Sequence, residues 1–174
     1  MGRVHLGELL RRDGLIGEDQ LQSALGYQRR WGIRLGEALL RLRLVEEEAL
    51  LRTVARQLGI PYVRIGKATV EPEVLAMLPA RVIRRCRALP LELEAEAGRT
   101  HLLVAFARPD DLHAVDEVVF AAGLDVAPAL AGEDDLAGAI ARHLDGERVD
   151  EHGLRPLEHI DLPEAPLGPM RLVG

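Results

Sequence analysis

The stretch HLGELLRRDGLIGEDQLQSALGYQ at residues 5–28 returns as RLGEALLRLRLVEEEALLRTVARQ at residues 34–57. A shift of 29 residues aligns the two copies, and a spacer of five residues separates them. Among the identical pairs are Leu6 and Leu35, Gly7 and Gly36, Glu8 and Glu37, Leu10 and Leu39, Leu15 and Leu44, Leu21 and Leu50, and Gln28 and Gln57. Two copies are too few for a solenoid, but they can give matching half-sites to a two-fold symmetric ligand.

Each copy predicts a helical hairpin, because its apolar residues recur at helical spacing. In the first copy these positions are Leu6, Leu9 and Leu10, followed by Leu21, Ala24, Leu25 and Gln28. Asp13 and Gly14 supply the turn, and we expect Gly14 to take the left-handed conformation that ends a helix. The second copy has Arg43 at this position. Its turn is therefore expected to be tighter or strained.

Residues 60–145 alternate between strand and helix patterns. We expect a strand at Tyr62, Val63 and Ile65, and then a helix that Pro72 opens and Pro79 interrupts. Strands are expected at 88–94 and 101–107, joined by a turn at Ala97-Gly98. A helix from Pro109 to Gly123, a strand at 125–130 and a helix at 133–144 are expected to follow. Leu89, Leu91 and Leu93 are expected to point inward, and Leu112, Val115, Val118 and Val119 to form a buried helix face.

The sequence thus predicts an α+β fold in three parts. An N-terminal four-helix tandem-hairpin subdomain occupies residues 1–59, and a small mixed α/β subdomain occupies residues 60–145. From Gly146 onward, prolines are spread among acids and no period survives. We expect this Pro-rich tail, residues 146–174, to be extended or disordered, serving as a linker, as a peptide for a partner, or as both.

The charge distribution favours some ligand classes over others. The formal net charge is −6, yet residues 1–60 carry ten arginines against eight acids, whereas the remainder carries twelve basic residues against twenty acids. A modest positive surplus suits a small phosphate ligand better than a long polyanion, so no DNA binding is expected. The single Cys86 cannot form an internal disulfide. It is expected to be a small buried side chain in a reduced compartment.

No motif in the chain indicates catalysis. The sequence contains no G-x-x-x-x-G-K-[ST] phosphate loop, G-x-S-x-G or H-E-x-x-H, so we expect no catalytic residues and no enzyme. Two histidines and three aspartates lie near one another in sequence: His101, Asp110, Asp111, His113 and Asp116. Helix capping explains Asp110 and Asp111 better than a metal does, so neither a metal site nor a cofactor is expected. The lack of long apolar runs predicts a cytoplasmic protein without direct membrane insertion.

The tandem motif RLGxxL…L…Q, followed by LGIPYV, resembles the MshEN-type cyclic di-GMP-binding domain. That domain stands at the N-terminus of type II secretion and type IV pilus assembly ATPases, as in the GspE N-terminal domain. EPEVLAMLP, ALPLELE, LLVAFARPDDLHAVDEV and EDDLAGAIARHL resemble its α/β half, so the likeness covers residues 4–145. It implies a sensor or adaptor, here without the ATPase, that grips one extended cyclic di-GMP and acts on a protein partner in a secretion, pilus or motility machinery.

The residue types of the motif suit such a ligand. Glycines let a ligand approach the backbone, an arginine stacks on a base or forks to a phosphate, and glutamine amides offer donors and acceptors to a guanine edge. The predicted ligand-binding residues are His5, Leu6, Gly7, Leu10, Gln28, Arg34, Leu35, Gly36, Leu39 and Gln57.

His5 departs from the motif, which begins with arginine. Histidine lacks the fork and is charged only on acidification, so affinity is expected either to be lower than in the family or to rise at acidic pH. Arg3 or Arg12 could compensate. The alternative to nucleotide binding is a protein-interaction docking module for a secretion or pilus platform, in which the leucines serve only as core.

Overall fold

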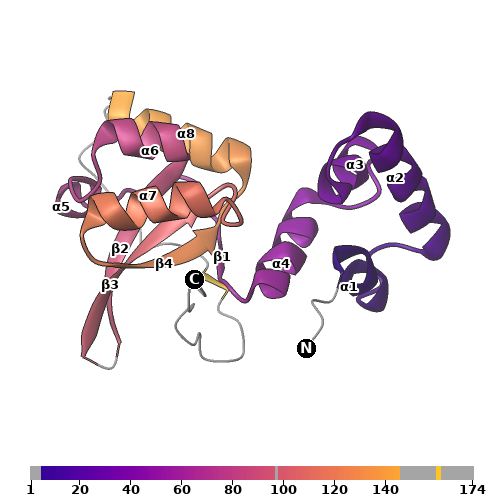
Figure 1. The fold of residues 1–174 in the computed structure, drawn as a ribbon, viewed down its shortest axis with the longest axis horizontal. Coiled ribbons are helices and arrows are strands. Elements are labelled where there is room, and N and C mark those ends of the chain that lie inside the picture. Colours follow the sequence, from indigo (N-terminus) through magenta and orange to yellow (C-terminus); the bar gives the residue numbers. More distant parts are fainter. Residues whose placement is uncertain (1–4, 97, 146–159, 162–174) are drawn as a thin grey trace. The chain divides into compact units, whose positions relative to one another are not determined.

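The structure, a computed structural model, describes residues 5–96, 98–145 and 160–161. It divides the chain into two compact units, Met1–Gly59 and Ile60–Gly174. Figure 1 shows that the first unit is helical and that the second combines helices with a sheet. No described helix is both long enough and apolar enough to span a bilayer.

Unit 1 is built from four helices (Figure 1): α1 (Leu6–Arg12), α2 (Glu18–Trp31), α3 (Leu35–Arg41) and α4 (Glu47–Leu58). The predicted pair of helical hairpins is confirmed. The first three residues of the spacer between the copies are helical, because α2 continues through Trp31. Gly32, with a φ of 65°, ends α2 in the left-handed conformation, which a glycine adopts without a steric penalty.

The two hairpin turns have the same backbone path. Gly14 has a φ of 71°, as expected, and Arg43 has a φ of 54°. The amides of Gly14 and Leu15 donate to Arg11 and Leu10 over 3.0 and 2.9 Å, and those of Arg43 and Leu44 donate to Leu40 and Leu39 over the same distances. The second turn is therefore strained rather than tighter, because a side chain occupies a conformation that favours glycine.

The core of unit 1 is aliphatic. Its buried members are Leu10, Ile16, Leu21, Ala24, Ala38, Leu39 and Leu50. Glu46 flanks the start of α4, whose first turn holds Glu47 and Glu48, so this acidic run lies at the positive end of a helix dipole.

Unit 2 holds a mixed sheet with the order β2-β3-β4-β1-β5. The strands are β1 (Tyr62–Val63), β2 (Ala88–Glu96), β3 (Arg99–Phe106), β4 (Asp125–Leu130) and β5 (Ile160–Asp161). β4 lies parallel to both β3 and β1, whereas β2 pairs antiparallel with β3, and β5 with β1. β5 lies in the tail that was expected to be extended or disordered, and its two residues are extended. It pairs with backbone groups of β1 that would otherwise form an open sheet edge; the rest of the tail lies outside the described residues.

The helices of unit 2 are α5 (Pro72–Leu75), α6 (Ala80–Cys86), α7 (Leu112–Ala122) and α8 (Glu133–Asp145). α6 contacts both α7 and α8 (Figure 1). Cys86 is buried in the core of this unit, as expected, and burial raises the pKa of its thiol. Asp111 caps α7 by accepting from the amide of Ala114 over 3.3 Å.

The loop that follows β1 is tied to α8 by polar contacts. Asp135 accepts hydrogen bonds from the amides of Ile65 and Gly66, at 2.8 and 2.9 Å. Nε2 of His143 accepts from the amide of Val70 at 2.9 Å. Among the described residues, no three His, Cys, Asp or Glu side chains form a group that could hold a metal ion.

Two apolar faces differ from the expectation. Leu93 is 46% exposed rather than inward, because the register shifts between Pro90 and Glu92. A bulge of one residue moves the side chains beyond it to the other face of the strand. On α7, Leu112 and Val119 are exposed, and only Val118 of the predicted face is fully buried.

Candidate functional site

The site residues of the two copies meet where α1 and α3 begin. The Cβ that an alanine would carry at position 7 lies 2.7 Å from Cδ1 of Leu21 and 3.5 Å from Cδ2 of Leu35. Leu21 belongs to the same copy as Gly7, and Leu35 belongs to the other. Gly7 therefore allows close packing within its own hairpin and against the opposite one.

Gly36 makes the same contacts with the copies exchanged. Its added Cβ would lie 3.5 Å from Cδ2 of Leu50, in its own copy, and 4.0 Å from Cδ2 of Leu6, in the other. The helices repeat the pattern, since α1 contacts α4 and α3 contacts α2. Reciprocal contacts of this kind are the mark of an isologous interface. The two copies are thus related by an approximate two-fold axis within one chain.

His5 and Arg34 occupy equivalent positions at this junction. Each immediately precedes its short helix with an extended backbone, at φ and ψ of −71° and 142° for His5 and −74° and 153° for Arg34. Both side chains are exposed. The first amides of each short helix have no acceptor within the helix, so each copy offers N–H groups beside an exposed cationic or ionisable side chain.

The four predicted leucines form two layers. Leu6 and Leu35 are partly exposed and lie against the opposite glycine. Leu10 and Leu39 have no exposed surface and belong to the core. In this conformation Leu10 and Leu39 cannot touch a ligand face, because other core side chains enclose them. They support the junction from beneath.

Gln28 and Gln57 lie in the last turns of α2 and α4 and are partly exposed. Each is seven residues beyond the leucine that packs on its glycine, Leu21 or Leu50. Seven residues of helix span about 10 Å. The glutamines are thus placed symmetrically but away from the glycine contacts, so only a ligand of extended shape could reach both kinds of position.

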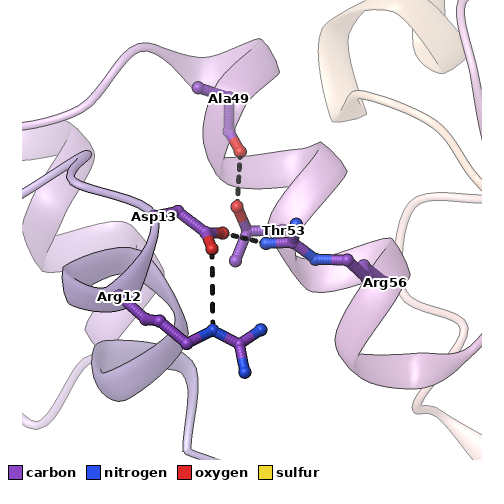
Figure 2. A network of polar contacts seen from close by, with 5 residues as sticks. All are labelled: Arg12, Asp13, Ala49, Thr53 and Arg56. Atoms are coloured by element: carbon purple, nitrogen blue, oxygen red, sulfur yellow. Dashed lines mark hydrogen bonds and ion pairs between the residues drawn. The ribbon is translucent and has the colours of Figure 1, made fainter.

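A polar network breaks the symmetry of the repeat. Figure 2 shows Asp13 beside the guanidinium of Arg56, with Arg12 Nε 3.8 Å from the same carboxylate and Thr53 Oγ1 donating to the carbonyl of Ala49 over 2.9 Å. Thr53 is the buried polar residue of the described core. The ion pair joins the end of α1 to α4.

The symmetry-related positions are apolar. In the 29-residue alignment, Asp13 corresponds to Leu42, Thr53 to Ala24 and Arg56 to Tyr27. Tyr27 and Leu42 pack against the unit 1 core instead. This network was not predicted from the sequence. The signal that could have revealed it is the set of positions where the two copies differ rather than agree.

A shallow depression of about 240 Å³ lies beside the second turn. It is lined by Leu15, Arg43, Leu44, Val45, Glu46 and Ala49. None of the ten predicted site residues lines it. The candidate site is therefore an exposed junction of helix starts rather than this depression.

Comparison with known proteins places the chain in a family. The MshEN domain family matches residues 58–150. A structure of MshE with cdg has a TM-score of 0.70 and 31% identity, covering 80% of this chain and 99% of that one. The N-terminal domain of XpsE has a TM-score of 0.53 and 26% identity, covering 79% of this chain and 92% of that one.

The curated relatives are longer proteins. The type IV pilus assembly ATPase PilB of Myxococcus xanthus is 33% identical over 138 residues, which are 79% of this chain and 24% of the relative. PilB of Thermus thermophilus is 34% identical over 143 residues, 82% of this chain and 16% of the relative. The chain spans a quarter or less of these ATPases. The family match over more than half of the sequence shows that this chain belongs to the MshEN domain family.

Proposed function

We propose that this chain is a regulatory module that binds one cyclic di-GMP along the junction of α1 and α3. The observation that carries the proposal is the exchange of contacts between Gly7 with Leu35 and Gly36 with Leu6. Cyclic di-GMP is itself two-fold symmetric, and two equivalent half-sites related by a two-fold axis fit such a ligand without a change of register. The solved structure of MshE with cdg, which we read as cyclic di-GMP, supports this choice.

Each half-site contributes the same chemistry. The exposed side chains of His5 and Arg34 meet a phosphate or the plane of a guanine, Leu6 and Leu35 contact a base face, and Gln28 and Gln57 are the donors and acceptors for guanine edges. The buried Leu10 and Leu39 hold the short helices in place. His5 makes the first half-site the weaker one, because an imidazole cannot form the bidentate contact of a guanidinium.

The proposed role is regulation of a protein machine rather than catalysis. Two matched relatives are pilus assembly ATPases, and a matched structure is an N-terminal domain. Cyclic di-GMP would bind the arrangement of the two hairpins that fits it and would raise the population of that arrangement. The readout we propose is contact with a protein of a pilus or secretion assembly.

Titration calorimetry with cyclic di-GMP, and with GTP as control, tests the nucleotide. We expect one cyclic di-GMP per chain and no heat from GTP. Arg34→Ala should weaken binding by roughly tenfold or more, the value of a hydrogen bond to a charged group. Arg29→Ala is the matched control, because it removes an exposed arginine of α2 outside the motif. Equal losses in both variants, or no heat with cyclic di-GMP, would contradict the site.

Gly36→Ala separates ligand contact from folding. The added methyl meets only ordinary packing distances, 3.5 Å or more, and alanine favours helix over glycine. The variant should therefore fold as stably as the parent while losing affinity for cyclic di-GMP. Unchanged affinity would show that the ligand does not approach this backbone.

A further inference from the structure

Unit 2 presents an apolar surface on α7. Phe120 is 90% exposed, Leu112 is 52% exposed and Val119 is 38% exposed. These positions are separated by seven and eight residues, so they lie on one side of the helix. We call Leu112, Val119 and Phe120 the α7 apolar face. Scattered exposed leucines are ordinary in monomers, but three large apolar side chains on one helical face mark an interaction surface.

The composition of α7 supports a missing partner. Its sequence, LHAVDEVVFAA, holds eight apolar residues and three polar ones, His113, Asp116 and Glu117, which is more apolar than the stripe of an ordinary surface helix. Only the side carrying Val118 is fully buried within unit 2. Ala114, Val115, Ala121 and Ala122 pack partly buried against the unit 2 core, so the apolar side chains of α7 left exposed are Leu112, Val119 and Phe120.

The charges around this face are negative. α7 contains no lysine or arginine, and Asp116 lies between Leu112 and Phe120 on the same side. Asp110, Asp111 and Asp125 flank the helix at its two ends, and Arg108 is the one basic residue among these flanking positions, so the acids outnumber it. Arg85 approaches α7 but forms an ion pair with Glu117. A partner of this face therefore needs apolar side chains together with basic ones.

We propose that the α7 apolar face docks a basic amphipathic helix of another protein. The apolar stripe of that helix covers Leu112, Val119 and Phe120, and its lysines or arginines meet Asp116 and the flanking aspartates. This is an interaction surface in unit 2, separate from the junction in unit 1 to which the nucleotide is assigned. It does not depend on whether cyclic di-GMP binds.

Charge also argues against two other occupants. Residues 146–174 of the chain contain six acids and three arginines, so this segment would bring negative charge to a negative rim. A second copy packed α7 against α7 around a two-fold axis would bring Asp116 close to its own counterpart, and like charges brought together in an interface are unfavourable.

The test uses two labelled 14-residue peptides of helical pattern, one of leucine and lysine and one of leucine and glutamate, with binding to the full chain followed by fluorescence anisotropy. We expect the Leu/Lys peptide to bind and the Leu/Glu peptide not to bind. Phe120→Ser should weaken the Leu/Lys complex at least tenfold. Asp116→Lys should reverse the preference between the two peptides. Leu93→Ser is the matched control, because Leu93 is a 46% exposed leucine of the same unit away from α7.

Phe120 and Asp116 are exposed, so these variants should fold, as circular dichroism will check. Retained Leu/Lys binding by Phe120→Ser would overturn the proposal, because it would reduce the contact to nonspecific charge attraction. A comparable loss in Leu93→Ser would do the same. Self-association of the parent chain that Phe120→Ser abolishes, measured by sedimentation, would assign the face to a second copy instead.

Discussion

At the scale of single residues, the two copies of the repeat can be compared as if each were a mutant of the other. Gly14 and Arg43 have φ values of 71° and 54° in turns with the same hydrogen bonds. The fold of the hairpin, rather than the residue, therefore sets the backbone conformation. A non-glycine residue in this region costs about 1 kcal/mol.

Replacing Arg43 with glycine should therefore stabilise unit 1 by about 1 kcal/mol. Gly14→Ala should destabilise it by a similar amount, and for a purely backbone reason, because no atom lies within 4 Å of the added Cβ. Urea unfolding followed by tryptophan fluorescence measures both changes. A lower midpoint for Arg43→Gly would mean that the arginine side chain makes a stabilising contact that outweighs the strain.

The two motif glycines should respond differently to alanine. At Gly7 the new Cβ lies 2.7 Å from Cδ1 of Leu21, which is buried and has little room to move. Overpacking of this kind costs about 1–3 kcal/mol, more than the gain of roughly 1 kcal/mol in helix propensity. Thermal unfolding should show Gly7→Ala below the parent and Gly36→Ala level with it or above. The reverse order would contradict the packing around α1.

At the scale of elements, helical period and punctuation by glycine and proline predicted most of the fold. The boundaries of α7, β4 and α8 follow directly from Asp111, Gly123 and the apolar spacing. The exposure of individual faces was less accessible. The alternation of Leu89, Leu91 and Leu93 looks regular, and only the pairing with β3 reveals the extra residue in β2. Register is a property of two strands, so one strand's sequence cannot report it.

Glu92, in the β2–β3 hairpin, has a carboxylate whose ionised form is less favourable in the folded state than in the unfolded state. Burial, with a smaller effect of Glu94, raises the pKa of Glu92 above its ordinary value of 4.5. Between pH 4.5 and the raised pKa, the folded state binds more protons at Glu92 than the unfolded state does. The effect of Glu92 is therefore to lower the free energy of unfolding as the pH rises through this range. This destabilisation is absent well below pH 4.5, and it stays constant at pH values above the folded-state pKa.

Glu92→Gln should therefore raise the urea midpoint at pH 7, and the gain over the parent should shrink as the pH approaches 4. Circular dichroism is the appropriate signal because Glu92 lies in the sheet of unit 2. Glu94→Gln is the control, because it removes a carboxylate from the same strand. It also weakens the contact between Glu94 Oε2 and His101 Nε2, which are 2.8 Å apart. No rise in the urea midpoint is therefore expected for this variant. A gain for Glu92→Gln that is independent of pH would contradict the assignment.

At the scale of the whole molecule, the repeat predicted two half-sites but not how they are combined. Identical residues such as Leu6 and Leu35 could equally have formed two separate pockets. Only the folded chain shows that Leu6 contacts Gly36 and that Leu35 contacts Gly7. The full burial of Leu10 and Leu39 could not be predicted either. A leucine repeated in both copies can be a ligand contact or a core residue, and the repeat does not distinguish the two.

The division into two units makes a last prediction possible, because the chain's one tryptophan, Trp31, lies in unit 1. The ring centroid of Trp31 lies 5.6 Å from Cζ of Arg30 and 6.0 Å from the ring centroid of Tyr27. Its fluorescence should therefore report the unfolding of unit 1 alone, whereas circular dichroism reports both units. Cyclic di-GMP at 100 times its Kd should raise the fluorescence midpoint by about 10–20 °C. Leu10→Ala and Leu102→Ala remove leucines with no exposed surface from units 1 and 2, each costing about 3 kcal/mol. Leu10→Ala should lower the midpoint measured by fluorescence. Leu102→Ala should lower only the midpoint measured by circular dichroism. Coincident transitions in every variant would show that the two units unfold as one.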